Sequence, residues 1–523
     1  MIEANTAARL AARFATLAPA QRRAFLDKMA EQGIAFSQLP IPALPQGGDD
    51  AAGAPLSYAQ QRQWFLHQFE PASAAYHISS GVSLRGRLDV AALGAAFATL
   101  AQRHAALRTA FVADAAGEVR QRVLPAAALA MPLLDLYQGS AAEATPQARA
   151  ARADAIAAEL AGQPFDLGSA PLLRVRLLRL GEEEHRLLLV MHHIVSDGWS
   201  MQLLIDELAA CYRAHLLGDA ASLPALPVGY ADYAAWQRNW LEAGEQERQL
   251  AYWRAQLADA PAVLALPTDR PRPAAAVYQA HRLDIEIPDA LAQALRERGR
   301  AHGATLFMVL LAGFQALLYR HAGSRDLCVG VPVANRNRIE TEGVVGLFVN
   351  TQIVRGRLDG RQPLAAALEQ ARAAVLGAQA HQDLPFEQLV DALQPERSMS
   401  YNPLFQVVHN HRRSDRAALA ELPGLVLETA PIGERSTALE LTLDTRESTD
   451  GHISACFHYA AELFDAATVA RLGAHYLRLL RQLAEAPEVA LDAVALLDAG
   501  ERSALLALGQ GEAPPADGLA VHQ

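Results

Sequence analysis

The residues best suited to chemistry are two adjacent histidines, His192 and His193, with Asp197 four residues after the second of them. They follow the apolar run RLLLVM at 186–191, which is typical of a strand buried on both faces. The apolar pattern over 199–217 predicts a helix, so the histidines lie where a strand ends and a helix begins. Crevices open at such strand ends in α/β sheets, and side chains there can meet a substrate.

Three interpretations of this cluster stay open on the residues alone. Both histidines could be core or turn residues that make only structural hydrogen bonds. One of them and Asp197 could bind a metal ion with a third ligand such as His104 or His381, although neighbouring side chains on a strand point to opposite faces. The third interpretation is acyl transfer, because a neutral imidazole, with a reference pKa of about 6.5, can take or share the proton of an attacking amine.

The rest of the chain alternates strands and helices, as the placement of such a cluster requires. Strands are expected near 76–86, 171–180, 281–287, 326–333, 348–356 and 453–460, and helices near 89–103, 199–217, 230–256, 304–322 and 465–485. We therefore predict an α/β protein with two lobes, 51–225 and 226–495. A helical extension with a linker is expected over 1–50, and a linker over 496–523.

Composition narrows the class of protein. The chain has 523 residues, 51% hydrophobic residues and a formal net charge of -11, which argues against a nucleic-acid binder and fits a globular protein. None of its three cysteines, Cys211, Cys328 and Cys456, forms a CxxC pair. That spacing argues against a zinc ribbon or a disulfide framework and favours the reducing cytoplasm. No secretory signal and no apolar run of membrane-spanning length is evident, so no membrane span is expected.

The segment MHHIVSDGWS at 191–200 resembles the HHxxxDG signature of the condensation domains of nonribosomal peptide synthetases. Six more segments resemble motifs of that family in the family's order: SYAQQRQWFL (57–66), RHAALRTAF (103–111), YADYAAWQ (230–237), VGLFVNTQIVR (345–355), HQDLPFEQLVD (381–391) and RSMSYNPLFQV (397–407). Three positions depart from the pattern, because Ala105, Ser398 and Tyr401 stand where the family usually has Glu, Asp and Arg.

The resemblance implies a V-shaped pseudo-dimer of two lobes similar to chloramphenicol acetyltransferase, with a tunnel between them. It implies an amide-forming acyltransferase that binds no metal and no cofactor of its own, since the substrates are carried on phosphopantetheine or coenzyme A. The implied partners are an acceptor peptidyl carrier protein, a donor acyl-CoA or acyl- or peptidyl-carrier protein, and a following adenylation domain in the same chain.

The resemblance also assigns roles to the cluster. His193 matches the residue at the centre of the tunnel and is the predicted catalytic group. Gly198 matches a glycine whose N–H faces the developing oxyanion, and such a donor stabilises the transition state. His192 and Asp197 are expected to be structural, with Asp197 held by Arg62.

Six residues are candidates for the wall of the tunnel: Trp199, Ser200, Asn350, Gln352, Ser436 and Thr437. For Asn350 and Gln352, which are polar residues in an apolar run, hydrogen bonds that bridge the lobes are favoured over substrate contact. Structural roles are also expected for Arg108 and Asp383.

The subtype is predicted from motifs that the chain has or lacks. The intact HHxxxDG disfavours heterocyclisation domains, the VGLFVNTQ segment disfavours epimerisation domains, and no DFGWG motif of plant-type transferases is present. Met1 stands 55 residues before the first motif, which favours a starter domain that acylates the first amino acid from acyl-CoA or an acyl carrier protein. The alternatives are an internal domain with an L- or D-configured peptidyl donor, and a platform that binds carrier proteins without catalysis.

Overall fold

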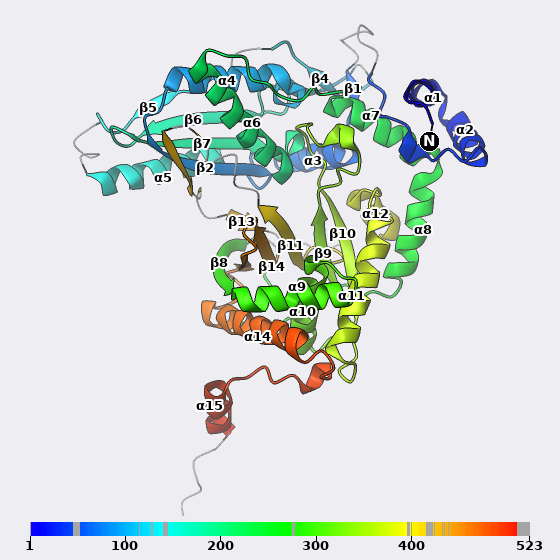
Figure 1. Cartoon of the computed structure of the whole chain (residues 1–523), viewed down its shortest axis with the longest axis vertical. Helices are drawn as coiled ribbons and strands as arrows, with labels where there is room; N and C mark the ends of the chain where they lie inside the picture. The colour runs from blue at the N-terminus through cyan, green and yellow to red at the C-terminus, as the bar shows by residue number, and fades with distance from the viewer. Residues whose placement is uncertain are drawn as a thin grey trace, which may run out of the picture.

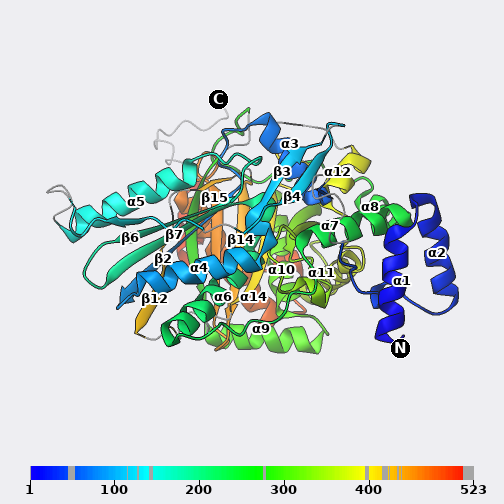
Figure 2. The same cartoon turned by 90° about the horizontal axis from the view of Figure 1, so that it is seen from above.

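The structure of the chain is a computed structural model, drawn in Figure 1 and, from above, in Figure 2. It describes residues 2–44, 53–114, 116–126, 129–139, 145–274, 278–394, 398, 400–414, 422, 424–430, 432, 435–437 and 439–509. The described strands form two main sheets, each packed against helices, and one small sheet of three strands. The predicted α/β class is confirmed, while the pseudo-dimeric V and the exact lobe boundaries stay predictions.

The sheet of the first lobe has five strands in the order β12-β2-β7-β6-β5. They are β2 (His77–Gly86), β5 (Leu133–Asp135), β6 (Leu173–Arg179), β7 (Glu184–His192) and β12 (Leu425–Ala430). Helices α4 (Val90–Arg103) and α6 (Gly198–Leu217) lie on one face and α5 (Pro146–Gly162) on the other (Figure 2). Because helices cover both faces, β7 is buried from residue 187 to its end, as its unbroken apolar run predicts.

The small sheet lies beside the first lobe and has the order β1-β4-β3. Its strands are β1 (Ala54–Pro55), β3 (Thr109–Ala113) and β4 (Val119–Val123). Helix α3 (Tyr58–Phe69) follows β1 and begins with a capping box, in which Ser57 and Gln60 each accept the other's backbone N–H. The side-chain amide of Gln60 also donates to the carbonyl oxygen of Ile194 at 3.3 Å, which ties α3 to the turn after β7.

The sheet of the second lobe has seven strands in the order β10-β9-β11-β14-β15-β8-β13. They are β8 (Tyr278–Ile287), β9 (Asp326–Val333), β10 (Asn350–Arg357), β11 (Val407–Ser414), β13 (Arg435–Thr437), β14 (Leu441–Ser448) and β15 (Ile453–Ala460). The helices of this lobe are α9 (Asp289–Ala301), α10 (Leu306–Ala322), α11 (Leu364–Gln379), α12 (Phe386–Leu393) and α14 (Ala466–Glu485). In the part of the chain that is described, no single helix is long and apolar enough to cross a membrane, and only α9 with α10, bent by 103°, passes such a test as a pair.

Two connections cross between the lobes. Helix α7 (Tyr230–Trp240) is followed by the turn Leu241–Glu245, which is kinked at Gly244, and by α8 (Gln246–Leu257), which runs down the side of the molecule (Figure 1). The other connection is β12, which lies within the predicted second lobe but pairs antiparallel with β2 of the first. A simple division at residue 225 is therefore wrong for β12, because its backbone completes the edge of the first sheet.

Helices also occupy both ends of the described chain. The predicted N-terminal helices are α1 (Ala4–Thr16) and α2 (Pro19–Glu31), which form a hairpin. At the other end, α15 (Ala499–Gly509) extends from the body of the molecule (Figure 1). The segment predicted as a linker over 496–523 thus contains a helix over eleven residues, whose run SALLAL favours helix formation, and its role as a linker stays a prediction. Residues 510–523 of that predicted linker, and residues 45–50 of the first one, lie outside the described residues.

Candidate active site

The two histidines stand on different elements. Strand β7 ends at His192, and His193 begins a 3₁₀ turn, His193–Val195, whose first N–H donates to the carbonyl oxygen of Tyr76 at 2.8 Å. The prediction that both lie on the strand is therefore wrong for His193. His192 is buried against the ring of His77, while His193 is only half-buried.

The environment of His193 favours the uncharged imidazole. Burial lowers the pKa of His193, and the carboxylate of Asp197 and the backbone carbonyl groups of His193 and Ser196 oppose that effect. The Nδ1 atom of the ring is buried and has no hydrogen-bond partner among the described residues. Since Nδ1 is enclosed, Nε2 is the nitrogen that an amine can approach, and in the tautomer with the proton on Nδ1 the Nε2 lone pair can accept a proton or a hydrogen bond.

Asp197 is a structural anchor at the start of α6. Its side chain is about 2% exposed and accepts from Ser200 N at 2.8 Å, which caps the helix. The other carboxylate oxygen accepts from the backbone N–H groups of Phe348 at 2.9 Å and Val349 at 3.2 Å, in the second lobe. With its oxygens held this way, Asp197 joins the two lobes and has no free role as a base.

The arginine that holds Asp197 is Arg336, and the prediction of Arg62 is wrong. Arg336 Nη2 lies 3.3 Å from Asp197 Oδ1, and both side chains are about 2% exposed. Arg62 instead pairs with Glu387 of α12 at 3.0 Å, with 41% of its own side chain exposed. Arg62 therefore links the lobes at their surface, away from the carboxylate it was expected to neutralise.

Arg336 belongs to a loop of the second lobe that reaches the first. We call residues 334–349, between β9 and β10, the crossing loop. Beyond its ion pair, Arg336 donates to Ser200 Oγ at 2.8 Å and to the carbonyl oxygen of Val344 at 2.6 Å. Ser200 Oγ in turn donates to the carbonyl oxygen of Gly346 at 2.9 Å and accepts from its N–H at 3.1 Å. These bonds fix the crossing loop against the first turn of α6.

Ser200 and Trp199, two of the residues predicted to line the tunnel, have different positions in the structure. Ser200 is fully buried in this network, so the prediction that it lines a tunnel is wrong. Trp199 is 48% exposed, and its indole N–H donates to the carbonyl oxygen of Glu342 at 3.0 Å. The indole N–H of Trp199 therefore bridges the lobes, and its predicted contact with a substrate stays a prediction.

Gly198 is the exposed first residue of α6. The first N–H groups of a helix have no partner within the helix, and its N-terminus favours negative charge. A Cβ atom placed on Gly198 would meet no atom within 4 Å, so the packing of the protein does not require a glycine here. The free N–H and the space in front of it suit a donor to an oxyanion.

We predict that Gly198→Ala leaves the fold unchanged and slows amide formation by about tenfold or more. The added methyl group enters open space and favours the helix, so any loss of rate reports crowding of a bound substrate. Gly162→Ala is the matched control, because Gly162 also faces open space but lies in α5 rather than at the active-site turn. Urea unfolding and single-turnover rates check both, and equal rates for the two variants would contradict the role of Gly198.

The polar residues of β10 act within the second lobe. Asn350 donates to the carbonyl oxygens of Gln382 at 2.9 Å and Leu384 at 2.8 Å, and Gln352 donates to that of Ala378 at 3.0 Å. Both side chains are buried, so neither the favoured bridging of lobes nor a place in the tunnel wall is borne out. Their bonds instead satisfy the backbone at the end of α11 and the start of α12.

The remaining candidates have simpler positions. Ser436 and Thr437 lie on the short strand β13, beside β8, and Thr437 Oγ1 accepts from the N–H of Leu439 at 3.0 Å. The side chain of Ser436 lies outside what the structure describes, so its predicted role stays a prediction. The expected structural role fits Arg108, which donates to backbone carbonyl oxygens including that of Ala101 at 2.9 Å.

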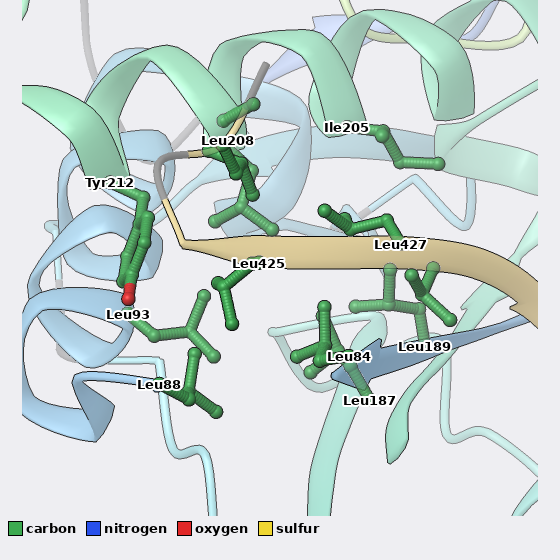
Figure 3. A pocket seen from close by; sticks show the side chains of 13 residues that line it. Leu84, Leu88, Leu93, Leu187, Leu189, Ile205, Leu208, Tyr212, Leu425 and Leu427 are labelled. Atoms are coloured by element: carbon green, nitrogen blue, oxygen red, sulfur yellow. The ribbon is translucent and has the colours of Figure 1, made fainter. Parts of the chain in front are cut away.

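The metal alternative gains no support from geometry. Over the described residues, no group of three or more His, Cys, Asp or Glu side chains is placed to hold an ion. The two proposed third ligands are engaged elsewhere: His104 Nε2 lies 2.6 Å from Glu207, and the ring of His381 stacks on Tyr252 at 3.8 Å. The apolar pocket of Figure 3 is also separate, because its lining comes from β2, β7, α4, α6 and β12 and does not include His193.

His192 lies in a cluster of rings whose burial disfavours positive charge. The rings of His67, His77 and Phe165 lie 5.8–6.1 Å from that of His192. Burial, followed by the neighbouring histidines, lowers the pKa of His192 to about 3. Since the unfolded chain takes up a proton at about 6.5, the stability from a neutral His192 is present above that pH and is lost as the pH falls towards 3.

We therefore predict that His192 makes folding sensitive to mild acid. Between pH 6.5 and 5.5, protonation of this residue in the unfolded chain should lower the free energy of unfolding by about 1 kcal/mol. Urea unfolding at pH 6.5 and 5.5 measures the loss of unfolding free energy between the two. In His192→Phe this loss should be smaller by about 1 kcal/mol. Leu216→Ala, at an exposed residue of α6 that does not titrate, is the control and should leave the loss unchanged. An identical loss in all three chains would contradict the prediction.

Comparison with known proteins now decides the family. The model described as "Condensation domain" matches residues 51–506. This chain belongs to the condensation-domain family. Among curated relatives of this condensation domain, a protein of the linear gramicidin synthase of Brevibacillus parabrevis is 44% identical over 86% of the chain. Phosphinothricin tripeptide synthetase PhsC of Streptomyces viridochromogenes is 40% identical over 98% of it.

The condensation domain is a small part of these relatives, since it spans 6% of the gramicidin synthase protein and 46% of PhsC. Among solved structures, the X-domain from teicoplanin biosynthesis is 30% identical with a TM-score of 0.74, over 88% of this chain and all of that one. The first condensation domain of the calcium-dependent antibiotic (CDA) synthetase, 24% identical with a TM-score of 0.67 over 85% and 99% of the two chains, shows the same fold.

The residue that sequence reasoning missed is Arg336. It stands in ANRNR at 334–338, directly after the apolar strand β9, where one charged residue among several gives no sign of burial. Its neighbour in space, Tyr230, was matched only as part of a motif. The Tyr230 hydroxyl lies 2.8 Å from Ser57 Oγ and donates to the carbonyl oxygen of Leu347 at 2.5 Å. The signal that could have marked this junction is the apolar run VVGLFV at 344–349. A loop that contacted only its own lobe would not need so many apolar residues in a row.

Proposed function

We propose that this condensation domain joins a donor acyl group to the amine of an aminoacyl thioester held on a carrier protein. One observation carries the proposal: the half-buried ring of His193, whose pKa is lowered by burial, directly follows β7 and stands five residues before the exposed Gly198 that begins α6. An uncharged imidazole can receive an amine proton, and the helix turn can receive the negative charge that develops on the thioester oxygen.

The amine nitrogen attacks the donor carbonyl carbon, so a C–N bond forms while the carbonyl oxygen becomes an oxyanion near the N–H of Gly198. Nε2 of His193 holds the amine in place and takes up its proton. When the C–S bond breaks, the carbonyl re-forms and the donor thiolate leaves, to be protonated by the histidine. Phosphopantetheine or coenzyme A supplies the thioesters, and no step needs a metal or a further cofactor.

The contacts between the lobes support this proposal, because they hold the His193 ring and the N–H of Gly198 in fixed relative positions. Asp197 lies four residues after His193 and directly before Gly198. Its carboxylate is held by Arg336 and by the N–H groups of Phe348 and Val349 in the crossing loop. Positioning of this kind can supply a large part of a rate enhancement. The partly exposed Trp199 lies at the same turn, where an incoming pantetheine arm would pass it.

The test is incubation with a donor and an aminoacyl carrier protein, followed by mass detection of the acylated product. Separate reactions use an acyl-CoA, an acyl carrier protein and a peptidyl carrier protein as the donor. Product in any of them supports condensation, and its absence in all of them, with carriers known to be loaded, overturns it. The starter assignment remains a prediction from the sequence, which product from acyl-CoA or the acyl carrier protein alone would support.

A second candidate is a platform that binds partner proteins without catalysis. It is favoured by the similarity to the teicoplanin X-domain, which is 31% identical and was solved as a complex with OxyB. The intact His193, Asp197 and Gly198 favour catalysis over this alternative. Binding of loaded carriers without turnover in the same reactions would support the platform. We propose the cytoplasm as the compartment, in keeping with three free cysteines among the described residues.

A further inference from the structure

The segment after the N-terminal hairpin lies outside the matched family region, which begins at residue 51. We call residues 34–44 the strap. We infer that the strap positions the active-site turn of the first lobe by holding the crossing loop of the second. The inference rests on the proposed function only for its effect on rate, because the contacts themselves are independent of the reaction.

The strap is anchored first by an aromatic side chain. The ring of Phe36 stacks on Trp236 at 5.8 Å and on Trp240 at 5.3 Å, with interplanar angles of 11° and 19°. On its other side it meets Phe14 of α1 edge-on at 5.1 Å. Aromatic contacts of this geometry add to the burial of the rings. Phe36 therefore clamps the strap between the hairpin and α7.

The strap then bonds directly to the crossing loop. The guanidinium of Arg338 donates to the carbonyl oxygen of Ser37 at 3.0 Å and also to that of Leu39. In return, Glu340 accepts the N–H of Ile41 at 3.3 Å and lies 3.4 Å from Arg338. In each of these hydrogen bonds a charged side chain of the crossing loop meets a main-chain group of the strap. Such charge-assisted bonds are stronger than neutral ones, so they hold the two segments in a fixed relative position.

Ile41 extends the contact into the core of the junction. Its side chain is buried in a cluster with Val344, Leu347 and Phe348 of the crossing loop. The guanidinium of Arg336 lies over the ring of Phe348 at 4.0 Å. The backbone N–H of Phe348 donates to the carboxylate of Asp197. One face of the loop is thus packed on the strap while its backbone and Arg336 hold the active-site turn.

The strap does not touch His193, so Phe36 and Ile41 are positioning residues that act through the crossing loop. If Ile41 is truncated, the cluster that it shares with Val344, Leu347 and Phe348 loses one of its buried side chains, and the loop can shift away from Asp197. A displacement on the order of 1 Å at the catalytic turn is enough to slow a reaction by up to about a hundredfold. The consequence is a lower rate without a change in which substrates are accepted.

The test compares Ile41→Ala and Phe36→Ala with Arg23→Ala in the full chain. Arg23 lies on α2 and makes an exposed ion pair with Glu247, at 3.2 Å, so its loss removes a contact of the hairpin but none of the strap. The first readout is hydrogen exchange of the N–H groups of Gly346, Phe348 and Val349, which bond to Ser200 and Asp197. The second is the single-turnover rate of amide formation with saturating loaded carriers.

We expect exchange at 346–349 to rise by about tenfold in the two strap variants and to stay unchanged in Arg23→Ala. The rate should fall by about tenfold in the same two variants, and Ile41→Val, which keeps most of the packing, should recover it. Unchanged exchange at 346–349 in the strap variants would overturn the inference, even if the rate falls. Raised exchange in a chain that forms no product with any donor would leave the strap in place and reject the proposed function instead.

If Ile41→Ala lowers the unfolding midpoint so far that native exchange cannot be measured, Phe36→Ala is the test variant on its own. A rise of about tenfold at 346–349 is still expected, again without a rise in Arg23→Ala. No rise would overturn the inference.

Discussion

Replacing His193 with alanine is expected to lower the single-turnover rate of amide formation by about 100- to 10,000-fold. This is the usual contribution of a positioned side chain that transfers a proton in the transition state. The ring is half-buried and lies outside the hydrophobic core, so the variant should keep its fold. Mass detection of acylated carrier over time measures the rate, and urea unfolding checks the fold.

A glutamine at this position separates the two ways in which His193 can act. His193→Gln retains hydrogen-bonding groups but has no nitrogen that takes up a proton near neutral pH. If orientation of the amine is the main contribution, the glutamine variant should recover a large part of the rate lost in His193→Ala. If proton transfer dominates, both variants should be equally slow. Full activity in His193→Ala would remove this residue from the chemistry.

Replacing Arg336 with alanine is expected to cost about 3–5 kcal/mol in the free energy of unfolding. The substitution leaves the carboxylate of Asp197 buried at 1% exposure without its ion pair, and that is the costly way to break a buried pair. It also removes donors to Ser200 Oγ and to the carbonyl oxygens of Thr341 and Val344. Urea unfolding measures the loss, and the rate of amide formation should fall with it.

Arg62→Ala is the matched control, since both arginines link the lobes through a carboxylate. The pair of Arg62 with Glu387 is partly exposed, so its loss should cost less than about 1 kcal/mol. Equal losses for the two variants would contradict the assignment of Arg336 as the residue that holds Asp197. A larger loss for Arg62→Ala would restore the interpretation that the sequence first suggested.

Much of the fold is predictable from the sequence because the decisive patterns are local. The run at 186–191 has too few polar residues for a strand with one wet face, and β7 is indeed buried on both faces. Asp89 is a residue type typical of a helix cap, and its carboxylate accepts the N–H of Ala92 at 2.9 Å at the start of α4. The strong apolar pattern of 304–322 likewise predicts α10, which is buried along most of its length.

The partners of the site residues were harder to predict, because they depend on contacts distant in sequence. Asp197 and Arg336 are 139 residues apart, and no local pattern selects this arginine among the 46 basic residues of the chain. Strand β12 was missed for the same reason, since pairing with β2 across the lobes leaves no periodic trace. Asn350 was placed at a lobe bridge because it is polar in an apolar strand, whereas its partners, the carbonyl groups of Gln382 and Leu384, belong to its own lobe.

The most direct measurement is a crystal structure of the domain with a stable amide analogue of an aminoacyl-pantetheine bound as the acceptor. We predict the amine nitrogen at about 2.6–3.2 Å from Nε2 of His193. The same structure should leave room for a donor carbonyl oxygen at the N–H of Gly198. An amine bound elsewhere, or a His193 ring that no channel reaches from either face, would contradict the account.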